Sequence, residues 1–475
     1  MRFIVILLFV LSALSNFAST VNGVAKDYIG ESIRLVFYTD LFSQQPILVG
    51  ETTVASDGSF TFEYDVKQTR LIALKIKDYR SNFFVAPNSN YTVQLGKFDP
   101  LSAPPLSKDK YLPAKLVKED EDKINNAIGL LNVSLDSFEQ KHYKAFLNHK
   151  AKPIVQDFML VLTKNDLYNK NSFFRQYTDA VIGSLLYKAQ YSFEEVYNKS
   201  LTVPVDYQNV GYTNLVNDFY NKWFNRYRLT KENEQLKTLI SAANYNELST
   251  FLATNDFLKN DTLREIIIVK ELFRLAVNDN TVDPVAVDKV LSTISTTGNT
   301  RENKQIAKYY LERLRKLGIG AEAPNFGLFN VDGDAFQLKD FRGKYVYLDF
   351  WATWCKPCLK SMQVMKQLHP KYMDNVEFIS VNIDERKKRF DKHMEAYSYP
   401  WTVLYAGSNE KIKNDYDIVV IPLYYLIDPN GKLIQSPAFS PGGGIETTFS
   451  KLFNSDTKEE IKIWDWNFDP KNTGK

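Results

Sequence analysis

Residues 345–358 read Tyr-Val-Tyr-Leu-Asp-Phe-Trp-Ala-Thr-Trp-Cys-Lys-Pro-Cys, an apolar run that ends in two closely spaced cysteines. The run 345–351 is typical of a strand that is buried on both faces of a sheet. Residues 359–372 continue with a helical pattern of apolar side chains, and Pro357 suits the first turn of that helix. The stretch therefore predicts a strand that leads directly into a helix, with Cys355 where the helix begins.

The sequence around this stretch predicts an α/β domain over residues 318–455. Further strands are expected at 376–384, 422–428 and 432–438, with a last helix at 445–453. Alternating strands and helices predict a sheet covered by helices on both faces. Residues 318–326 are expected to be a linker. The tail 456–475 carries three large aromatic residues, so we expect it to pack on a domain surface.

Residues 24–110 predict an all-β accessory domain, a small sandwich or barrel. Apolar and polar side chains alternate along short segments that are separated by turn signals such as Ser56-Asp57-Gly58. Short strands at regular spacing are typical of these all-β folds. The proline-rich stretch 100–115 is expected to link this domain to the next.

Residues 111–317 predict an all-α domain, because the apolar residues now recur with the period of a helix. Ser134 and the pair Asp283-Pro284 are expected to begin two of its helices. This region is too long for a spacer. We expect it to offer a surface for homodimerisation or for docking a partner.

The first residues, 1–23, are typical of a signal peptide. Arg2 precedes the apolar run 3–14, which is too short to span a membrane, and small residues follow it. We therefore expect an exported protein, periplasmic or in the cell envelope of a bacterium, or luminal or secreted in a eukaryote. No cysteine lies near the expected cleavage position, so a bacterial lipoprotein is not predicted.

Composition excludes several classes of protein. The net charge of +3 gives no electrostatic reason to expect nucleic acid as a partner. Two cysteines and four histidines are too few for a zinc-finger or multi-metal protein, and we expect neither a metal nor a cofactor. Covalent haem would need a histidine where Leu359 stands. A peroxidatic cysteine would need a threonine where Ala352 stands.

The spacing of Cys355 and Cys358 indicates redox chemistry. A disulfide between them closes so small a loop that it adds little stability, so a structural role explains the pair poorly. Free N–H groups at a helix start and the charge of Lys356 stabilise a thiolate. We expect Cys355, as the more exposed cysteine, to attack a substrate disulfide, and Cys358 to resolve the mixed disulfide.

Asp349 is the only charged residue in the expected strand 345–351. A carboxyl group in such an apolar strand is expected to have a raised pKa through desolvation. Asp349 is then suited to exchange a proton with Cys358 through a water molecule. The alternative interpretation is a satisfied buried aspartate that caps a neighbouring loop.

The segment LDFWATWCKPC (348–358) resembles the active-site motif of the thioredoxin superfamily. Residues 323–351 are similar to the entry segment of its TlpA/ResA-type thiol–disulfide oxidoreductases, and residues 419–432 resemble the family's cis-proline strand and hairpin. The resemblance covers about residues 321–455. It implies a thioredoxin-like fold for this region and a role in cell redox homeostasis.

The resemblance also implies roles for single residues. Pro422 is expected to follow a cis peptide bond and Ile421 to offer backbone groups to an extended substrate, while Trp354 shields the cysteine pair and packs against substrate. Lys356 and Pro357 replace the Gly-Pro of thioredoxin and are expected to tune the redox potential.

Two classes of function remain open. The first is an exported thiol–disulfide oxidoreductase that acts on protein thiols and disulfides and is served by an electron donor that the sequence does not identify. The second is a partner-binding scaffold protein of the cell envelope, in which the thioredoxin fold is not catalytic.

Overall fold

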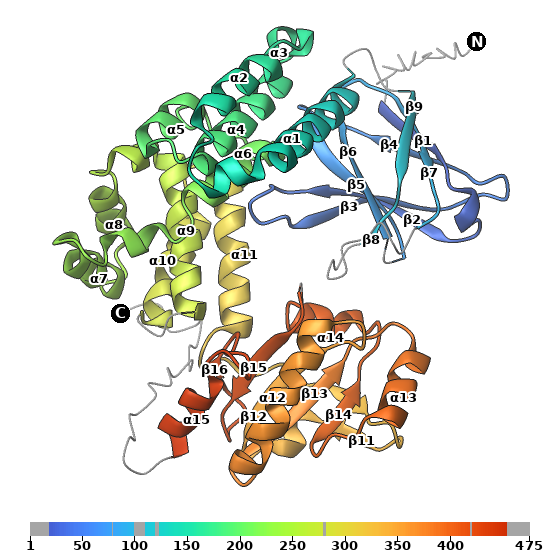
Figure 1. Cartoon of the computed structure of the whole chain (residues 1–475), viewed down its shortest axis with the longest axis vertical. Helices are drawn as coiled ribbons and strands as arrows, with labels where there is room; N and C mark the ends of the chain where they lie inside the picture. Colours follow the sequence, from blue (N-terminus) through green and yellow to red (C-terminus); the bar gives the residue numbers. More distant parts are fainter. Residues whose placement is uncertain are drawn as a thin grey trace, which may run out of the picture.

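Figure 1 shows the computed structural model of the protein. The structure describes residues 19–77, 79–98, 110–118, 123–278, 282–418 and 420–453. Figure 1 shows strands at the N-terminal end of the chain, a group of helices after them, and a mixed sheet with helices at the C-terminal end. Most of the expected signal peptide and all of the tail 456–475 lie outside the described residues.

The N-terminal strands form two sheets, ordered β4-β1-β7-β9 and β3-β2-β5-β6-β8. Both sheets contribute to one apolar core, for example through Val21 and Val93 of the first and Ile33 of the second. The alternating pattern seen in the sequence places these side chains on the inner faces. The strands are β1 (Ser19–Val24), β2 (Ser32–Tyr38), β3 (Pro46–Thr53), β4 (Ser59–Tyr64), β5 (Arg70–Ile76), β6 (Tyr79–Val85), β7 (Tyr91–Leu95), β8 (Lys110–Tyr111) and β9 (Ala114–Lys118).

The limits of this β region differ from the expected limits 24–110. Strand β1 begins at Ser19, inside the segment assigned to a signal peptide, because its residues pair with β4 and β7. Strand β9 pairs with β7, so residues 114–118 belong to a sheet and not to a linker or a helical domain. The helices begin only at Ile124. Both limits of the β region are set by strand pairing with residues distant in the sequence. Local sequence patterns do not show this pairing.

The helical part shares one apolar core. Asp283 begins α10 as expected, since its side chain accepts a hydrogen bond from the N–H of Val285 and Pro284 is the first helical residue. The prediction for Ser134 is wrong, because α1 continues through it. The helices are α1 (Ile124–Leu147), α2 (Lys152–Leu162), α3 (Asp166–Lys170), α4 (Ser172–Lys188), α5 (Phe193–Ser200), α6 (Val210–Phe219), α7 (Glu232–Ser241), α8 (Tyr245–Leu252), α9 (Asp261–Asn278), α10 (Pro284–Thr297) and α11 (Arg301–Leu317), with the short 3-10 helices η1 (Lys26–Tyr28), η2 (Trp223–Tyr227) and η3 (Asp256–Leu258) in the regions before and between them.

Hydrogen bonds join the β region to the helices. The amide group of Asn125, at the start of α1, accepts from the N–H of Phe84 at 2.7 Å and donates to its carbonyl at 2.9 Å. The N–H of Leu41 donates to the carbonyl of Tyr207, and the Gln208 amide donates to the carbonyl of Thr39. These bonds place the β region against α1 and the segment before α6.

The C-terminal part is a seven-stranded mixed sheet in the order β11-β10-β14-β13-β12-β15-β16. Strand β12 is central and pairs in parallel with β13 and antiparallel with β15. Tyr347 contacts Phe449 of α15 on one face, while Phe350 contacts Tyr416 on the other. Both faces of β12 are thus covered, as its apolar sequence requires.

The elements of this part follow one another along the chain. They are β10 (Gly327–Phe329), β11 (Ala335–Gln337), the 3-10 helix η4 (Leu338–Phe341), β12 (Tyr345–Trp351), α12 (Lys356–Tyr372), β13 (Val376–Asn382), α13 (Lys387–Ala396), β14 (Thr402–Tyr405), α14 (Glu410–Asp415), β15 (Leu423–Ile427), β16 (Leu433–Gln435) and α15 (Ile445–Phe453). None of the helices in the described part of the chain is both long and apolar enough to cross a membrane.

The expected linker 318–326 is hydrogen-bonded to the C-terminal sheet. The N–H groups of Gly320 and Ala323 donate to the carbonyls of Leu433 and Gly431, at 2.7 and 2.9 Å. The N–H of Leu433 donates back to the carbonyl of Ala321. The prediction of a free linker is therefore wrong, because this segment pairs with the β16 hairpin.

Candidate active site

The two cysteines lie at the junction of β12 and α12. Cys355 is the N-cap residue of α12, and its Sγ accepts a hydrogen bond from the backbone N–H of Cys358 at 3.2 Å. Pro357 lies in the first turn, where its missing N–H removes no helical hydrogen bond. Cys355 and Cys358 form a disulfide, with their Cα atoms 5.2 Å apart. The expected strand, turn and helix are all present.

Both cysteines are buried in this oxidised form. The exposed fraction is 0% for Cys355 and 1% for Cys358, so the expectation that Cys355 is the more exposed cysteine is wrong here. Cys355 belongs to the same apolar cluster as Ala352 and Ile421. The solvent-facing residues of the motif are its neighbours, since Trp354 is 40% exposed and Lys356 and Pro357 are also exposed.

The loop that carries Pro422 lies next to the cysteine turn. Phe350 pairs with Leu423, so Pro422, directly before β15, lies beside the point at which β12 ends. The Ile421–Pro422 peptide bond is cis, as the resemblance implies. Ile421 is buried and Pro422 is half-buried. The sheet register thus brings together two segments that lie far apart in the sequence.

Asp349 lies in the middle of β12 and is buried. Its Oδ2 accepts a hydrogen bond from the Ser380 hydroxyl at 3.1 Å, and the indole N–H of Trp401 donates to the same Ser380 oxygen at 3.0 Å. Its Oδ1 makes no hydrogen bond with the residues that the structure describes. Burial raises the pKa of the Asp349 carboxyl to about 7, against the smaller effect of the Ser380 hydrogen bond. Among the described residues, this half-satisfied carboxyl group accepts a hydrogen bond from Ser380 and from no loop N–H.

Asp384 is a buried carboxylate that the sequence analysis missed. It accepts hydrogen bonds from the N–H and hydroxyl of Thr353, at 2.8 and 3.0 Å, and from the Asn382 amide at 2.8 Å. Thr353 lies two residues before Cys355, so Asp384 holds the turn that carries the cysteine. A signal was present in the sequence, because Asp384 is the last residue of the expected strand 376–384, and the structure shows that strand β13 is parallel to β12. The carboxyl ends of parallel strands meet at one edge of a sheet, where sites form.

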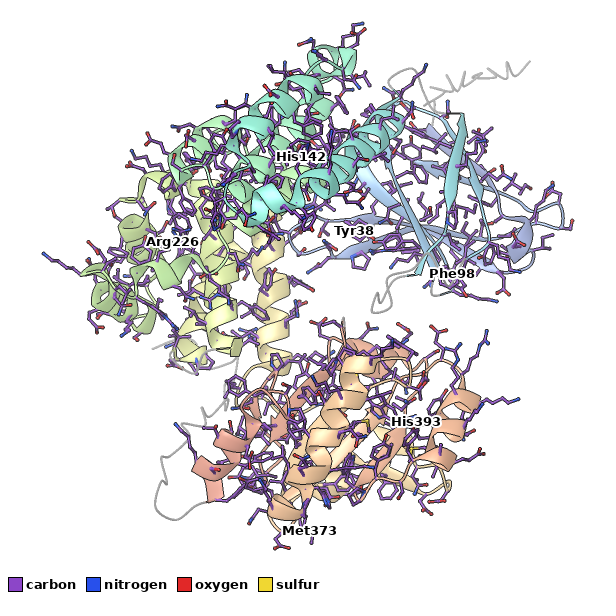
Figure 2. All side chains as sticks on the ribbon, in the orientation of Figure 1. Tyr38, Phe98, His142, Arg226, Met373 and His393 are labelled. Carbon is purple, nitrogen blue, oxygen red and sulfur yellow. A yellow bond between two sulfur atoms is a disulfide. The ribbon has the colours of Figure 1, made fainter. Side chains whose placement is uncertain are left out.

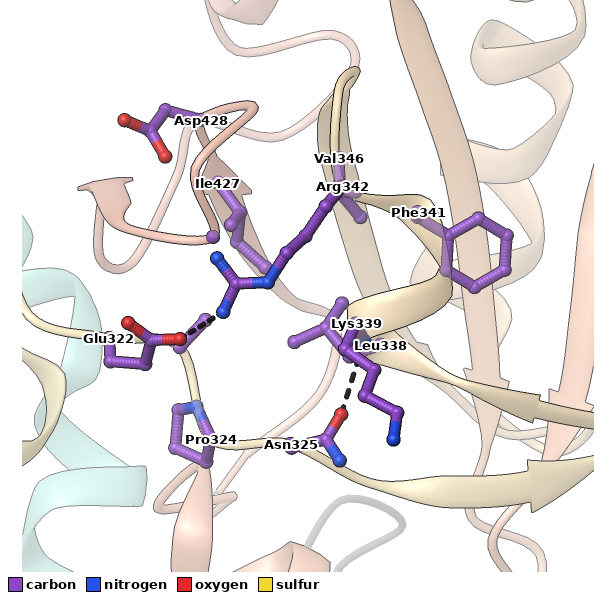
Figure 3. A pocket seen from close by; sticks show the side chains of 12 residues that line it. Glu322, Pro324, Asn325, Leu338, Lys339, Phe341, Arg342, Val346, Ile427 and Asp428 are labelled. Atoms are coloured by element: carbon purple, nitrogen blue, oxygen red, sulfur yellow. Dashed lines mark hydrogen bonds and ion pairs between the residues drawn. The ribbon is translucent and has the colours of Figure 1, made fainter.

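The structure also has a cavity of about 170 Å³ at the other end of β12 (Figure 3). Val346, near the start of the strand, lines it together with Glu322 and Arg342, which form an ion pair. The cysteines follow the opposite end of the same strand. This cavity is therefore separate from the cysteine pair. No group of His, Cys, Asp and Glu residues within the described parts of the chain is arranged to hold a metal ion.

The region that forms this site matches known proteins. Residues 319–436 match the family described as AhpC/TSA. A thiol-disulfide oxidoreductase ResA from Bacillus cereus (strain ATCC 10987 / NRS 248) is 41% identical over 127 residues, which cover 26% of this chain and 73% of the relative. The chain belongs to the ResA thiol-disulfide oxidoreductases. ResA from Bacillus subtilis (strain 168) is 33% identical over 120 residues, 25% of this chain and 66% of the relative.

A solved structure is also similar to this ResA-like region. It is the thioredoxin domain of a thiol-disulfide oxidoreductase from Bacteroides vulgatus, at 26% identity and a TM-score of 0.27, covering 29% of this chain and 98% of that one. By its match with the AhpC/TSA family and with the ResA relatives, the C-terminal part of the chain is a thioredoxin-like domain of an enzyme family whose members are thiol–disulfide oxidoreductases. The matches with the two ResA relatives and this structure cover less than a third of the chain.

The buried carboxyl group of Asp349 makes the stability depend on pH. Its pKa is higher in the folded protein than in the unfolded chain, so folding takes up a proton between about pH 4 and 7 and the free energy of unfolding falls as the pH rises through that range. We expect Asp349→Asn to unfold with a higher free energy than the wild type at about pH 8, and the difference to shrink towards about pH 4. Urea unfolding of the oxidised proteins at both pH values measures this. A difference that stays constant with pH would contradict it.

The hydrogen bonds of Asp384 predict a stability effect of a different kind. Asp384→Ala leaves the Thr353 and Asn382 donors without their acceptor, so we expect the free energy of unfolding to fall by about 1–3 kcal/mol. The adjacent Glu385 is exposed, and Glu385→Ala is the matched control with an expected change near zero. Equal effects of the two substitutions in urea unfolding would refute this role of Asp384.

Proposed function

We propose that this protein is an exported thiol–disulfide oxidoreductase that reduces or exchanges disulfides in extracytoplasmic proteins through Cys355 and Cys358. The observation that carries the proposal is the Cys355 sulfur at the start of α12, in hydrogen-bonding contact with the N–H of Cys358 and within bonding distance of its sulfur. The family of the C-terminal domain supports it. The signal peptide expected over residues 1–23 lies mostly outside the described residues.

The reduced form starts the proposed reaction. The Cys355 thiolate attacks one sulfur of a substrate disulfide, so that a mixed disulfide forms and the second substrate sulfur leaves as a thiolate. The helix dipole and the N–H of Cys358 stabilise the thiolate before attack. Lys356, exposed in the same turn, adds a positive charge nearby, and Pro357 fixes the backbone of the turn.

Cys358 completes the exchange. Asp349, with a pKa near neutrality, accepts the Cys358 proton through a water molecule, and the resulting thiolate attacks the Cys355 sulfur. The Cys355–substrate bond breaks, the substrate leaves with two reduced thiols, and the Cys355–Cys358 disulfide remains. Two electrons pass from the enzyme to the substrate, and a donor outside this chain must return them. The reverse sequence oxidises a substrate dithiol.

Residues around the pair are proposed to bind the substrate. Trp354 offers an exposed aromatic surface beside Cys355, and Ile421 and Pro422 lie where β12 ends. An extended peptide can pair with backbone groups of this loop and place its sulfur at Cys355. The residues before the C-terminal domain are proposed to be accessory, with a sandwich of the two N-terminal sheets and an all-α domain. We propose that this region docks partner proteins or a second copy of the chain, since α1 and α2 expose Leu147 and Leu160.

Insulin reduction tests the catalytic proposal against the scaffold alternative. We expect the wild-type protein to accelerate insulin reduction by dithiothreitol, and Cys355→Ser to return the rate to that of dithiothreitol alone, because serine provides no thiolate. The turbidity of reduced insulin measures both rates. Equal rates with the wild type and the variant would favour the scaffold function.

Alkylation of the reduced protein tests the activation of Cys355. The helix start is expected to lower the pKa of its thiol below the value of about 8.5 for free cysteine. We therefore expect iodoacetamide to modify Cys355 faster than free cysteine at about pH 6, as measured by mass spectrometry of the peptide 353–366. Cys355→Ser controls for reaction at Cys358, and a wild-type rate no faster than that of free cysteine would refute this activation.

A further inference from the structure

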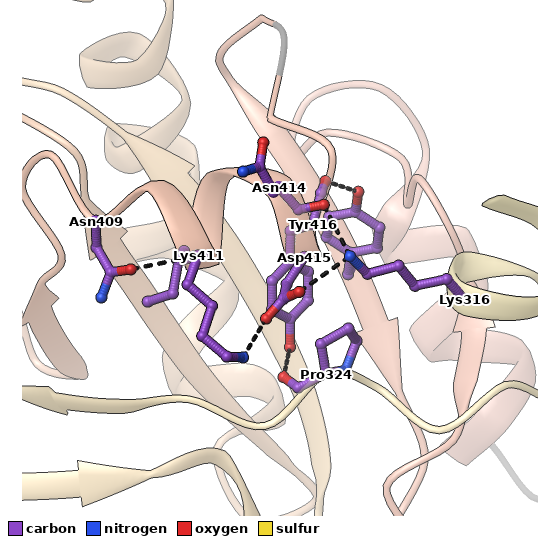
Figure 4. A network of polar contacts seen from close by, with 9 residues as sticks. Lys316, Pro324, Asn409, Lys411, Asn414, Asp415 and Tyr416 are labelled. Atoms are coloured by element: carbon purple, nitrogen blue, oxygen red, sulfur yellow. Dashed lines mark hydrogen bonds and ion pairs between the residues drawn. The ribbon is translucent and has the colours of Figure 1, made fainter. Parts of the chain in front are cut away.

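The last helix of the helical part contacts the segment that leads into the substrate loop (Figure 4). Lys316 of α11 pairs with Asp415 at 2.9 Å and donates to the carbonyl of Asn414 at 3.0 Å. Arg313, one turn earlier on α11, pairs with Asp417. Asp417 precedes Ile421 by four residues. Two cations of the helical part thus hold the chain just before the loop proposed to bind substrate.

The Arg313 side chain is itself held in place. Its guanidinium lies over the rings of Phe273 and Tyr309, with centroid distances of 5.2 and 5.3 Å. The Arg313 and Asp417 side chains are 32% and 28% exposed, so the pair is less screened by solvent than an ion pair on the open surface. The helical part therefore presents a fixed cation to Asp417.

Asp417, just after α14, has a backbone conformation that such a contact can hold. Asp417 has a φ of +45°, a left-handed conformation that few residues other than glycine adopt. The C-terminal domain fixes the residue before it, since the Tyr425 hydroxyl donates to the Tyr416 carbonyl at 2.6 Å and the Tyr416 hydroxyl donates to the Pro324 carbonyl at 2.5 Å. The Asp417 side chain is held by Arg313, from the other part of the chain.

The redox site lies at the end of the C-terminal domain that faces these helices. Met373, at the far end of α12, points away from the helical and β regions in Figure 2. The opposite end of α12, which carries Cys355, is therefore directed towards them. The residues that α11 contacts, Asp415 and Asp417, lie a few positions before the substrate loop.

We propose that Arg313 is a positioning residue for disulfide exchange, which acts through Asp417 to hold the Ile421–Pro422 loop in the position that receives substrate. The assignment of this loop rests on the function proposed above. Loss of the ion pair frees Asp417 to leave its left-handed conformation, and the loop then spends less time in the binding position. The helical part thereby contributes to substrate affinity without contacting the reacting sulfurs.

Steady-state reduction of a disulfide-containing peptide tests this role with the full-length protein. We expect Arg313→Ala to raise KM about threefold to fivefold, the effect of a partly screened ion pair, and to leave kcat and the Cys355–Cys358 reduction potential unchanged. The matched control is Arg315→Ala, because Arg315 lies on the same helix but pairs with Asp288 inside the helical part at 2.6 Å. The double variant Arg313→Asp, Asp417→Arg restores the pair with reversed charges and is expected to recover part of the affinity.

The outcomes separate this proposal from simple destabilisation. Equal changes in KM for Arg313→Ala and Arg315→Ala, or a shift in the reduction potential, would overturn it. Amide hydrogen exchange of peptides within 420–427 gives a readout that needs no turnover. If the wild-type protein reduces no disulfide, the function proposed above fails. Faster exchange in Arg313→Ala alone would then still support the positioning role, and unchanged exchange would overturn it.

Discussion

The contact between the Cys355 sulfur and the backbone N–H of Cys358 is the interaction on which the proposed redox site depends. It exists because β12 ends at Trp351 and α12 begins at Lys356, which leaves a short turn with Cys355 as the helix cap. The same N–H group would stabilise a thiolate after reduction. The rest of the domain serves to hold that turn in place, through the central strand on one side and Asp384 on the other.

Two buried carboxyl groups near this turn differ in how far hydrogen bonds compensate their burial. Both cysteines and Asp349 lie in an apolar interior, where charge is costly unless it is compensated. Asp384 is compensated by three hydrogen bonds, whereas Asp349 has one oxygen without a partner among the described residues. The two buried carboxyl groups therefore have different physical tasks. Asp384 holds the turn through its hydrogen bonds with Thr353. Asp349, with a pKa of about 7, is present in both its protonated and its ionised form near neutral pH.

The sequence predicted what depends on neighbouring residues. The strand 345–351, the helix after it and the cap Asp283 follow from local patterns, and the structure has them. Predictions from the sequence were wrong or incomplete where the structure depends on contacts between distant segments. Three features depend on contacts between segments that are distant in the sequence. They are the pairing of β9 with β7, the hydrogen bonds of Asp384 with Thr353, and the burial of Cys355 by surrounding residues. The link from Arg313 to Asp417 spans 104 positions, and no local pattern indicates it.

The segment that joins α11 to the C-terminal sheet has a consequence for how the protein works. Ala321 and Ala323 share backbone hydrogen bonds with Leu433 and Gly431, and the Ser436 hydroxyl donates to the carbonyl of Leu317 at the end of α11. These hydrogen bonds hold the segment in place, so the cysteine pair does not move independently of the helical part. Its targets must travel to it and approach from a direction that the neighbouring helices leave open. The accessibility of the cysteine pair, and not its range of motion, then determines which substrate disulfides react with it.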